Sequence, residues 1–218
     1  MTAPVGLFGG TFDPIHLGHL RLAEEMGAAL GCSEVRFLPT GTPPHRHPPQ
    51  ASATARRDMV ALAIADNPHF SLDEREINRR DPCFMVDTMT TIRAEVGAHI
   101  PLVLFLGSDA FMGLTTWHRW TDLFNLAHLA VAHRPGFGPQ TWDDSLPDAL
   151  RHEIDQRLSE RPAGLEITPA GHIYLHAITQ MDIAARRIRT ACRKGESVRY
   201  LVPDSVRAYL NQHELYRQ

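Results

Sequence analysis

The sequence predicts an α/β protein with a doubly wound, mostly parallel sheet and helices on both faces of that sheet. Two observations carry this prediction. An apolar run at residues 5–8 is followed by a glycine turn, a helical pattern from Leu17 and a second apolar run at residues 34–39, an order typical of a βαβ unit. Residues 101–107 are nearly continuously apolar, as a strand covered on both faces should be, and residues 126–132 predict the next strand.

Local patterns predict the remaining elements. Pro203 followed by Asp204 and Ser205 is typical of a helix start. We expect helices at residues 54–65 and 81–96, in the stretch 114–120, in an amphipathic piece at 146–158, within residues 178–189 and from 204 to about 210, and short strands at residues 70–72 and 173–175. The chain is expected to be one domain, residues 1–218, with a polar insertion at residues 138–163 and a C-terminal helical part at residues 184–218.

Composition excludes several classes of protein. The chain has 218 residues, enough for a real core, and its 43% hydrophobic and 22% charged residues are ordinary for a globular protein. A net charge of -3 gives no electrostatic case for binding nucleic acid or a membrane surface. We find no apolar run long enough to cross a bilayer and no signal-peptide pattern. Cys32, Cys83 and Cys192 are widely spaced, which favours reduced thiols and a cytoplasmic location.

The stretch Gly-Gly-Thr-Phe-Asp-Pro-Ile-His-Leu-Gly-His begins at Gly9 and joins the first strand to the first helix. Its two glycines let the backbone approach a ligand closely. The helix start near Leu17 directs free N–H groups and a positive dipole end to the same place, which attracts phosphate. His16 and His19 share one face of the first turn, where imidazoles can bind phosphate oxygens and take more positive charge as phosphate charge builds up. We expect both rings to face a cleft.

Other interpretations of these residue types stay open when each is taken alone. Two glycines after a strand are most often an ordinary turn. Two histidines three residues apart could be zinc ligands, although no third soft ligand lies nearby in the sequence. A Walker loop is excluded, because no Gly-Lys-Ser/Thr follows the glycines.

Taken whole, the stretch resembles the Gly-x-Phe-Asp-Pro-x-His-x-Gly-His signature of the nucleotidylyltransferase superfamily. Its exact residues are most similar to those of the bacterial nicotinate-nucleotide adenylyltransferases. The resemblance implies a Rossmann-like fold and a reaction in which the phosphate of nicotinate mononucleotide attacks the α-phosphorus of ATP, giving deamido-NAD and pyrophosphate. It implies Mg²⁺ carried with ATP and no metal site of the protein's own. ATP and nicotinate mononucleotide are then the expected partners, without nucleic acid or membrane, and a monomer or small homo-oligomer is the expected assembly.

A second block follows the strand at residues 101–107. Gly107 and Asp109, followed by Trp117 and Trp120, resemble the family block that distinguishes nicotinate nucleotide from other substrates of the superfamily. The resemblance implies that Asp109 binds ribose and that Trp117 stacks on the pyridine ring, whereas Trp120 is the better core candidate. From the residues alone, Ser108 or Asp109 could equally cap a helix and a tryptophan could belong to the core.

Two blocks depart from the family pattern. Cys83, Phe84 and Met85 stand where the family has Ser-Tyr-Thr, which keeps backbone donors for the nicotinate carboxylate and loses the hydroxyls. Near the C-terminus, Ala184 and Arg186 replace two hydroxyl residues that hold the ATP phosphates in the family, whereas Ile183 and Arg189 remain. We expect Arg186 to substitute in part for those hydroxyls, because it shares a helix face with Arg189. A solvated basic face is the alternative.

Two segments after strand ends complete the expected site. Residues 40–55 are rich in proline and histidine and form either a solvated connector or a basic flap over a phosphorylated substrate. The resemblance favours the flap, with His45 and Arg46 on the nucleotide phosphate. Arg134 resembles part of the family's Arg-Pro-Gly, and a surface arginine is the alternative.

The resemblance thus implies catalysis by His16 and His19, ATP binding by Gly9, Gly10, Thr11, Phe12, His16, His19, Gly107, Arg134, Ile183, Arg186 and Arg189, and nicotinate nucleotide binding by His45, Arg46, Phe84, Met85, Asp109 and Trp117. Two other functions stay open: a sister adenylyltransferase that uses nicotinamide mononucleotide or phosphopantetheine, and a non-catalytic nucleotide-binding relative.

Overall fold

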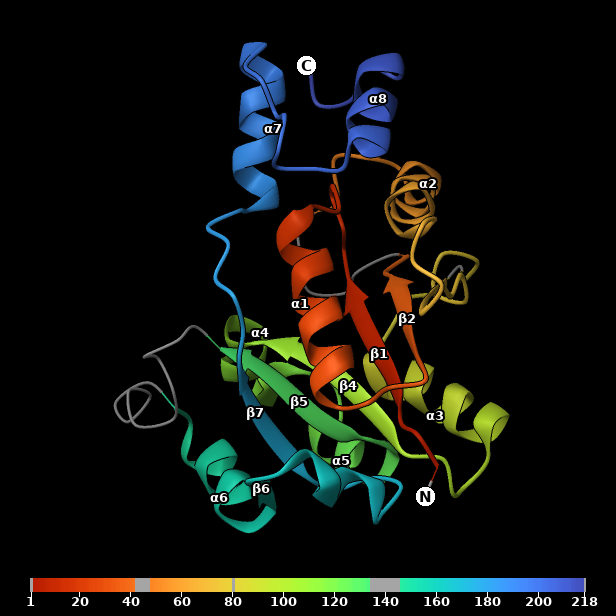
Figure 1. The fold of residues 1–218 in the computed structure, drawn as a ribbon, viewed down its shortest axis with the longest axis vertical. Coiled ribbons are helices and arrows are strands. Elements are labelled where there is room, and N and C mark those ends of the chain that lie inside the picture. The colour runs from red at the N-terminus through yellow and green to blue at the C-terminus, as the bar shows by residue number, and fades with distance from the viewer. Residues whose placement is uncertain (1, 42–47, 80, 134–145, 218) are drawn as a thin grey trace. The chain divides into compact units, whose positions relative to one another are not determined.

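A computed structural model describes residues 2–41, 48–79, 81–133 and 146–217, and it contains a seven-stranded sheet (Figure 1). The strands lie in the order β3-β2-β1-β4-β5-β7-β6. Their bounds are β1 Val5–Gly10, β2 Glu34–Pro39, β3 Phe70–Leu72, β4 Leu102–Gly107, β5 His128–His133, β6 Leu158–Ser159 and β7 Ile173–Ala177. The pairs β1–β4, β4–β5, β5–β7 and β6–β7 are parallel, which confirms the predicted α/β class.

Helices connect the strands, and most of them match the prediction. Their bounds are α1 Leu17–Ala29, α2 Ala53–Ile64, α3 Met85–Val96, α4 Ser108–Met112, α5 Leu123–Leu126, α6 Asp148–Arg157, α7 Ala185–Lys194 and α8 Asp204–Gln212, with 3-10 turns η1 Leu114–Thr116, η2 Trp120–Asp122 and η4 Pro162–Glu166. The strand β6 was not expected, and it adds part of the predicted insertion to the sheet.

Two expected helices differ from the prediction. Helix α3 begins at Met85 rather than near residue 81, because Phe84 is still extended, with ψ 134. The stretch 114–120 is not one helix: Trp117 is extended, with ψ 145, and Arg119 is left-handed, with φ 51. These two backbone conformations divide the stretch into the short turns η1 and η2.

The chain divides into two compact units. Unit 1 comprises Met1–Phe8, Ala23–Arg36 and Phe84–Thr179. Its core is the apolar centre of β4 and β5 and the residues that pack on it, among them Leu102, Val103, Leu104, Phe105, Leu129, Ala130, Val131, Ile173, Met26, Met89 and Ile92. Gly6 allows close packing there, since a Cβ at Gly6 would meet the Phe105 ring at 2.6 Å. Helices α3 and α5 lie behind the strands in Figure 1.

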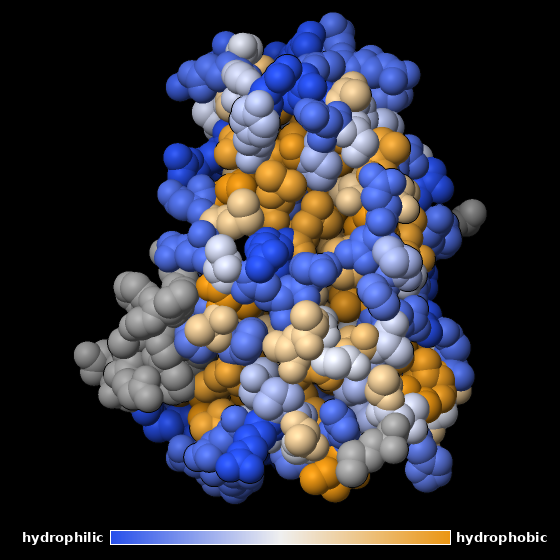
Figure 2. Space-filling view, viewed as in Figure 1, coloured by the Kyte–Doolittle hydropathy of each residue, from blue (hydrophilic) through white to orange (hydrophobic). Residues whose placement is uncertain are grey.

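Unit 2 comprises Gly9–Leu22, Phe37–Cys83 and Gln180–Gln218, and it contains the glycine turn and the helices α2, α7 and α8. Helix α8 packs on α2, where the Tyr209 hydroxyl donates to Asp58 at 2.9 Å and the Ser205 hydroxyl donates to the carbonyl oxygen of Leu62 at 3.1 Å. In Figure 2 the upper part of the view, where Figure 1 draws α7 and α8, is mostly hydrophilic, and hydrophobic residues gather just below it.

Among the described residues, no helix is both long and apolar enough to span a membrane. Cys32, Cys83 and Cys192 are not joined by a disulfide within the described residues.

A buried histidine in unit 1 predicts acid sensitivity. His128 is fully buried; its Nδ1 accepts from the backbone N–H of His172 at 3.0 Å and its Nε2 lies 2.8 Å from the carbonyl oxygen of Thr168. These partners fit a neutral ring with its proton on Nε2. Burial, with smaller contributions from His172 and Arg93, lowers the pKa of His128 from 6.5 to about 4. Since the unfolded chain then binds the proton first, stability is full above pH 6.5 and falls as the pH drops toward 4.

We expect His128→Gln to reduce this acid sensitivity, because a glutamine amide can keep one donor and one acceptor without titrating. Between pH 7 and pH 5 the wild type should lose about 2 kcal/mol more unfolding free energy than the variant. Urea unfolding at both pH values measures the difference, and equal losses would contradict this account of His128.

Candidate active site

A buried arginine holds the loops that follow β1 and β2. Arg56 lies on α2 and is 1% exposed. Its Nη1 donates to the carbonyl oxygens of Thr11 and Thr40 at 2.8 and 2.5 Å, and its Nη2 donates to that of Gly41 at 2.9 Å. The Thr40 N–H also donates to the carbonyl oxygen of Gly10 at 2.9 Å. One guanidinium group therefore holds the backbone of the glycine turn and of the loop after β2 in place.

The glycine turn itself is shaped by an aromatic ring. Phe12 has a left-handed φ of 47 and is 2% exposed. A Cβ at Gly10 would lie 2.9 Å from the Phe12 ring, so glycine is needed at this position. The Phe12 ring meets the His19 ring edge-on at a centroid distance of 5.1 Å. Phe12 as a whole is buried, whereas Gly9 and Thr11, which are also predicted to contact ATP, are half-buried.

The two histidines of the motif form a stacked pair. Their ring centroids lie 3.6 Å apart with an interplanar angle of 20°, which confirms that both rings share one face. The backbone N–H of His16 donates to Nδ1 of His19 at 3.2 Å. Since Nδ1 of His19 accepts, its proton lies on Nε2, which is then a hydrogen-bond donor.

The expectation that both rings face a cleft is wrong for His16. His19 is half-buried, but His16 is only 6% exposed. Gly18 favours this close packing, because a Cβ there would lie only 3.1 Å from Nδ1 of His16 and the ring would have to shift slightly. Nδ1 of His16 is buried and has no hydrogen-bond partner within the described part of the chain.

Burial keeps both imidazoles neutral. It lowers the pKa of His16 from 6.5 to about 4. Burial and, to a lesser degree, the neighbouring His16 lower the pKa of His19 well below its usual value. The rings therefore offer neutral N–H donors near pH 7, and an anion bound beside them would raise both pKa values.

The expected array of free N–H groups at the start of α1 is partly wrong. The Leu17 N–H donates to the carbonyl oxygen of Leu201 at 3.0 Å, and the His19 N–H donates to that of His16 at 2.9 Å. The first turn therefore uses these two N–H groups in hydrogen bonds within the turn and to the Leu201 carbonyl oxygen. The dipole of α1 and the imidazole pair are still placed to attract phosphate there.

Asp13 joins this turn to α7. Nη1 of Arg189 donates to the backbone carbonyl oxygen of Asp13 at 2.6 Å and lies 3.8 Å from its Oδ2. Asp13 is 7% exposed, and its carboxylate also accepts from the backbone N–H groups of Gln50 and Ala51 at 2.9 and 3.0 Å. The predicted phosphate ligand Arg189 therefore lies beside the predicted glycine-histidine turn.

The other predicted residues of this block lie around the start of α7. Ile183 lies close to the first turn of α1, with its Cβ 3.8 Å from the position of a Cβ on Gly18. Arg186 is exposed on the first turn of α7. Ala184 caps that helix without a side-chain hydrogen bond.

The predicted nicotinate residues of unit 1 lie at two helix starts and an aromatic cluster. Phe84 precedes α3 and Met85 begins it; both are half-buried. The Phe84 ring lies 4.6 Å from that of His118, the residue next to Trp117. Gly107 precedes α4, and the start of this helix has no side-chain cap. Asp109 is exposed on the first turn of α4.

Neither tryptophan belongs to the buried core. Trp117 and Trp120 are both half-buried. Trp120 packs edge-on to Phe124 at a centroid distance of 6.1 Å, so the expectation that it lies in the core is wrong. The short 3-10 turns leave both rings at the rim of the unit instead of turning Trp120 inward on a continuous helix.

Three predicted residues, His45, Arg46 and Arg134, lie outside the described residues. Within the described ranges no three His, Cys, Asp or Glu side chains gather as a metal site. Arg56, Asp13 and Tyr216 were not predicted from the sequence as site residues, and the Tyr216 hydroxyl donates to Oδ1 of Asp13 at 2.7 Å. The sequence contains one indication that Arg56 is buried. It shares a helix face with the apolar Met59 and Val60, which is unusual for a solvated arginine.

The chain is similar to a known family and to several named proteins. Residues 7–191 match the cytidylyltransferase-like family. A relative from Dechloromonas aromatica, named "Probable nicotinate-nucleotide adenylyltransferase", is 51% identical over 217 residues, covering 100% of this chain and 99% of the relative. One of the same name from Halorhodospira halophila is 47% identical over 203 residues, covering 93% and 90%.

A solved structure extends the comparison to the fold. The Plasmodium falciparum nicotinic acid mononucleotide adenylyltransferase complexed with NaAD has a TM-score of 0.71 at 15% identity, covering 98% of this chain and 97% of that one. At this identity the likeness shows the fold alone. Together, the parallel sheet and the family match define the class, a Rossmann-like nucleotidyltransferase. The chain belongs to the nicotinate-nucleotide adenylyltransferases within the cytidylyltransferase-like family.

Proposed function

We propose that this protein transfers the adenylyl group of ATP to nicotinate mononucleotide in NAD biosynthesis. A phosphate oxygen of nicotinate mononucleotide attacks the α-phosphorus, the bond from that phosphorus to the β-bridging oxygen breaks, and deamido-NAD and pyrophosphate result. The attacking phosphate is already anionic, so the reaction needs positioning and charge stabilisation more than an activated nucleophile. The observation that carries the proposal is the stacked His16–His19 pair beside the glycine turn.

His19 acts as a hydrogen-bond donor in this proposal. Its Nδ1 is occupied by the His16 N–H, so Nε2–H is the group directed at a phosphate oxygen. His16, whose ring is buried against that of His19, supports His19 by stacking. As negative charge moves to the leaving pyrophosphate, the pair stabilises that charge more strongly than it does the ground state.

Arg189 holds the leaving phosphates. Its guanidinium is anchored to the Asp13 backbone at one corner, which leaves its remaining N–H groups to bind oxygen. Gly9, Gly10, Thr11 and the Phe12 backbone would contact the nucleotide, and Gly107, Arg134, Ile183 and Arg186 complete the proposed ATP ligands.

Mg²⁺ enters as part of the substrate MgATP. The Asp13 carboxylate, three positions before His16, accepts from Gln50, Ala51 and Tyr216 and faces Arg189, so it has little capacity left for a metal. This fits a cation held by ATP oxygens and water.

Nicotinate mononucleotide is assigned to the residues of unit 1 and to the loop after β2. Trp117 would stack on the pyridine ring, Asp109 would accept from ribose, and the backbone at Phe84 and Met85 would bind the carboxylate. His45 and Arg46 would bind the nucleotide phosphate. We further propose a cytoplasmic location, for which the free thiols are suited, and a monomer or small homo-oligomer.

One assay tests the proposal. Purified protein with MgATP is offered nicotinate mononucleotide, nicotinamide mononucleotide or phosphopantetheine, and pyrophosphate release is followed. The proposal expects release with nicotinate mononucleotide at a kcat/KM well above that of the other two. Preference for another acceptor would contradict the assigned substrate, and the absence of release with all three would favour a nucleotide-binding relative without catalysis.

Arg186→Ala is expected to raise the KM for MgATP about fivefold, since one charge-assisted contact to phosphate would be lost. Arg187→Ala is the matched control, because the neighbouring Arg187 is paired with Asp182 at 2.9 Å and exposed. Steady-state kinetics at saturating nicotinate mononucleotide measure both variants. An unchanged KM in Arg186→Ala would favour the solvated basic face.

A further inference from the structure

We propose that Tyr216 is a positioning residue for the phosphate-binding turn, because its hydroxyl fixes the Asp13 carboxylate and, through Asp13, the place of Arg189. The inference rests on the proposed function and adds to it a residue outside the assigned site. It concerns unit 2 alone, and each contact that carries it lies within that unit.

Asp13 is the point at which distant parts of the sequence meet. Oδ1 accepts from the Tyr216 hydroxyl at 2.7 Å and from the Ala51 N–H at 3.0 Å. Oδ2 accepts from the Gln50 N–H at 2.9 Å and faces Arg189 at 3.8 Å. Three segments far apart in the chain are thereby fixed to the residue that lies three positions before His16.

The segment that bears Tyr216 is turned inward by its own backbone. After α8 ends at Gln212, Glu214 and Tyr216 adopt left-handed φ angles of 49 and 65. The Leu215 N–H donates to the carbonyl oxygen of Leu210 at 3.1 Å. Left-handed backbone is unfavourable for residues with a Cβ, so the surrounding contacts must hold this conformation in place.

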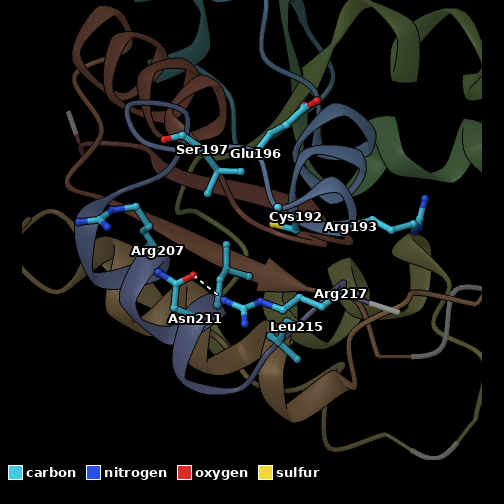
Figure 3. A pocket seen from close by; sticks show the side chains of 11 residues that line it. Cys192, Arg193, Glu196, Ser197, Arg207, Asn211, Leu215 and Arg217 are labelled. Carbon is cyan, nitrogen blue, oxygen red and sulfur yellow. Dashed lines mark hydrogen bonds between the residues drawn. The ribbon is translucent and has the colours of Figure 1, made fainter.

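The neighbours of Tyr216 face the other way. Leu215 and Arg217 line a cavity of about 570 Å³ between α7 and α8, and Nη2 of Arg217 donates to Oδ1 of Asn211 at 3.4 Å (Figure 3). Tyr216 is not among the lining residues and is 7% exposed. The alternation places the two flanking side chains at the cavity and directs the phenol to Asp13.

The phenol remains a donor over the whole working range of pH. Burial and the adjacent Asp13 carboxylate raise the pKa of Tyr216 far above its ordinary value. Other charged or titratable groups near the ring are Arg189 and Cys192, and burial raises the pKa of that thiol too. The hydrogen bond to Asp13 is therefore a fixed part of the turn.

Tyr216→Phe keeps the ring and removes only the hydroxyl. Without this donor the Asp13 carboxylate can shift, and the guanidinium of Arg189, which faces it, can shift as well. We expect the KM for MgATP to rise about tenfold, while the KM for nicotinate mononucleotide changes less than about twofold. The Kd of Mg²⁺ and α,β-methylene-ATP, measured by calorimetry, should rise by the same factor as the KM for MgATP.

Tyr209→Phe is the matched control. It removes another tyrosine hydroxyl of the same unit that donates to a carboxylate, that of Asp58, and it should leave both constants unchanged. A second test uses the Arg189→Ala background. If the hydroxyl acts through Arg189, Tyr216→Phe adds less than about twofold to the KM there.

Amide hydrogen exchange provides a readout that does not need turnover. The N–H groups of Gln50 and Ala51 should exchange faster in Tyr216→Phe than in the wild type or Tyr209→Phe. A lower unfolding midpoint in Tyr216→Phe with unchanged KM, Kd and exchange would overturn the proposal, as would a full tenfold effect in the Arg189→Ala background. If the wild type bound the ATP analogue and released no pyrophosphate, the proposed function would fail while the binding and exchange tests of Tyr216 still stood.

Discussion

His19→Ala is expected to lower kcat by about 10²- to 10³-fold, the loss typical of removing one preorganised donor to transition-state charge. The structure gives the reason: the His16 N–H occupies Nδ1 of His19 at 3.2 Å, so the ring can present Nε2–H to a phosphate oxygen. The KM for MgATP should change much less than kcat, because the contact strengthens as charge moves to pyrophosphate. Steady-state pyrophosphate release measures both constants.

His19→Gln separates hydrogen bonding from proton transfer. A glutamine amide can donate from near the position of Nε2 and cannot titrate, so we expect this variant to recover at least about tenfold of the kcat lost in His19→Ala. His69→Ala is the control, since His69 is an exposed histidine of the same unit. Near-normal turnover in His19→Ala would contradict the role given to this ring.

Arg56→Met is expected to cost about 3 kcal/mol or more of unfolding free energy. The substitution roughly keeps the volume, but it leaves the carbonyl oxygens of Thr11, Thr40 and Gly41 without their donor, at about 1 kcal/mol or more each. Urea unfolding measures the loss. The folded fraction should also show reduced turnover, because Thr11 belongs to the glycine turn.

The neighbouring arginine serves as the control. Arg57 is half-buried at the surface and pairs with Asp58 at 2.7 Å, so Arg57→Met should cost less than about 1 kcal/mol. A loss of the same small size in Arg56→Met would contradict the structural role assigned to Arg56.

Elements with strong local patterns were predictable from the sequence. The strands β1, β2, β3 and β4 and the helices α1, α2 and α8 lie where apolar spacing and helix-start residues place them. The stretch 114–120 was not predictable in this way. Its apolar spacing favours a helix, but the left-handed backbone at Arg119 breaks it, and nothing local in an arginine signals that conformation.

The features of the candidate site were likewise predictable only in part. The motif predicted the shared face of His16 and His19 correctly, because three-residue spacing on a helix fixes it. It did not predict that His16 is buried, since this depends on how the ring packs against Gly18. Arg56 and Tyr216 reach the glycine turn from positions 45 and 203 residues distant from their partners, and a local pattern carries no information about such long-range contacts.

The central claim is that a polyphosphate binds beside the start of α1 through the Nε2–H of His19. Nitrogen-15 NMR of the imidazole rings tests it most directly, during titration with Mg²⁺ and α,β-methylene-ATP. We expect the free protein to show His19 as a neutral ring protonated at Nε2, and that Nε2–H signal to shift with the same Kd that calorimetry gives. Saturation of the protein with the analogue while the His19 ring signals stay unchanged would contradict the claim.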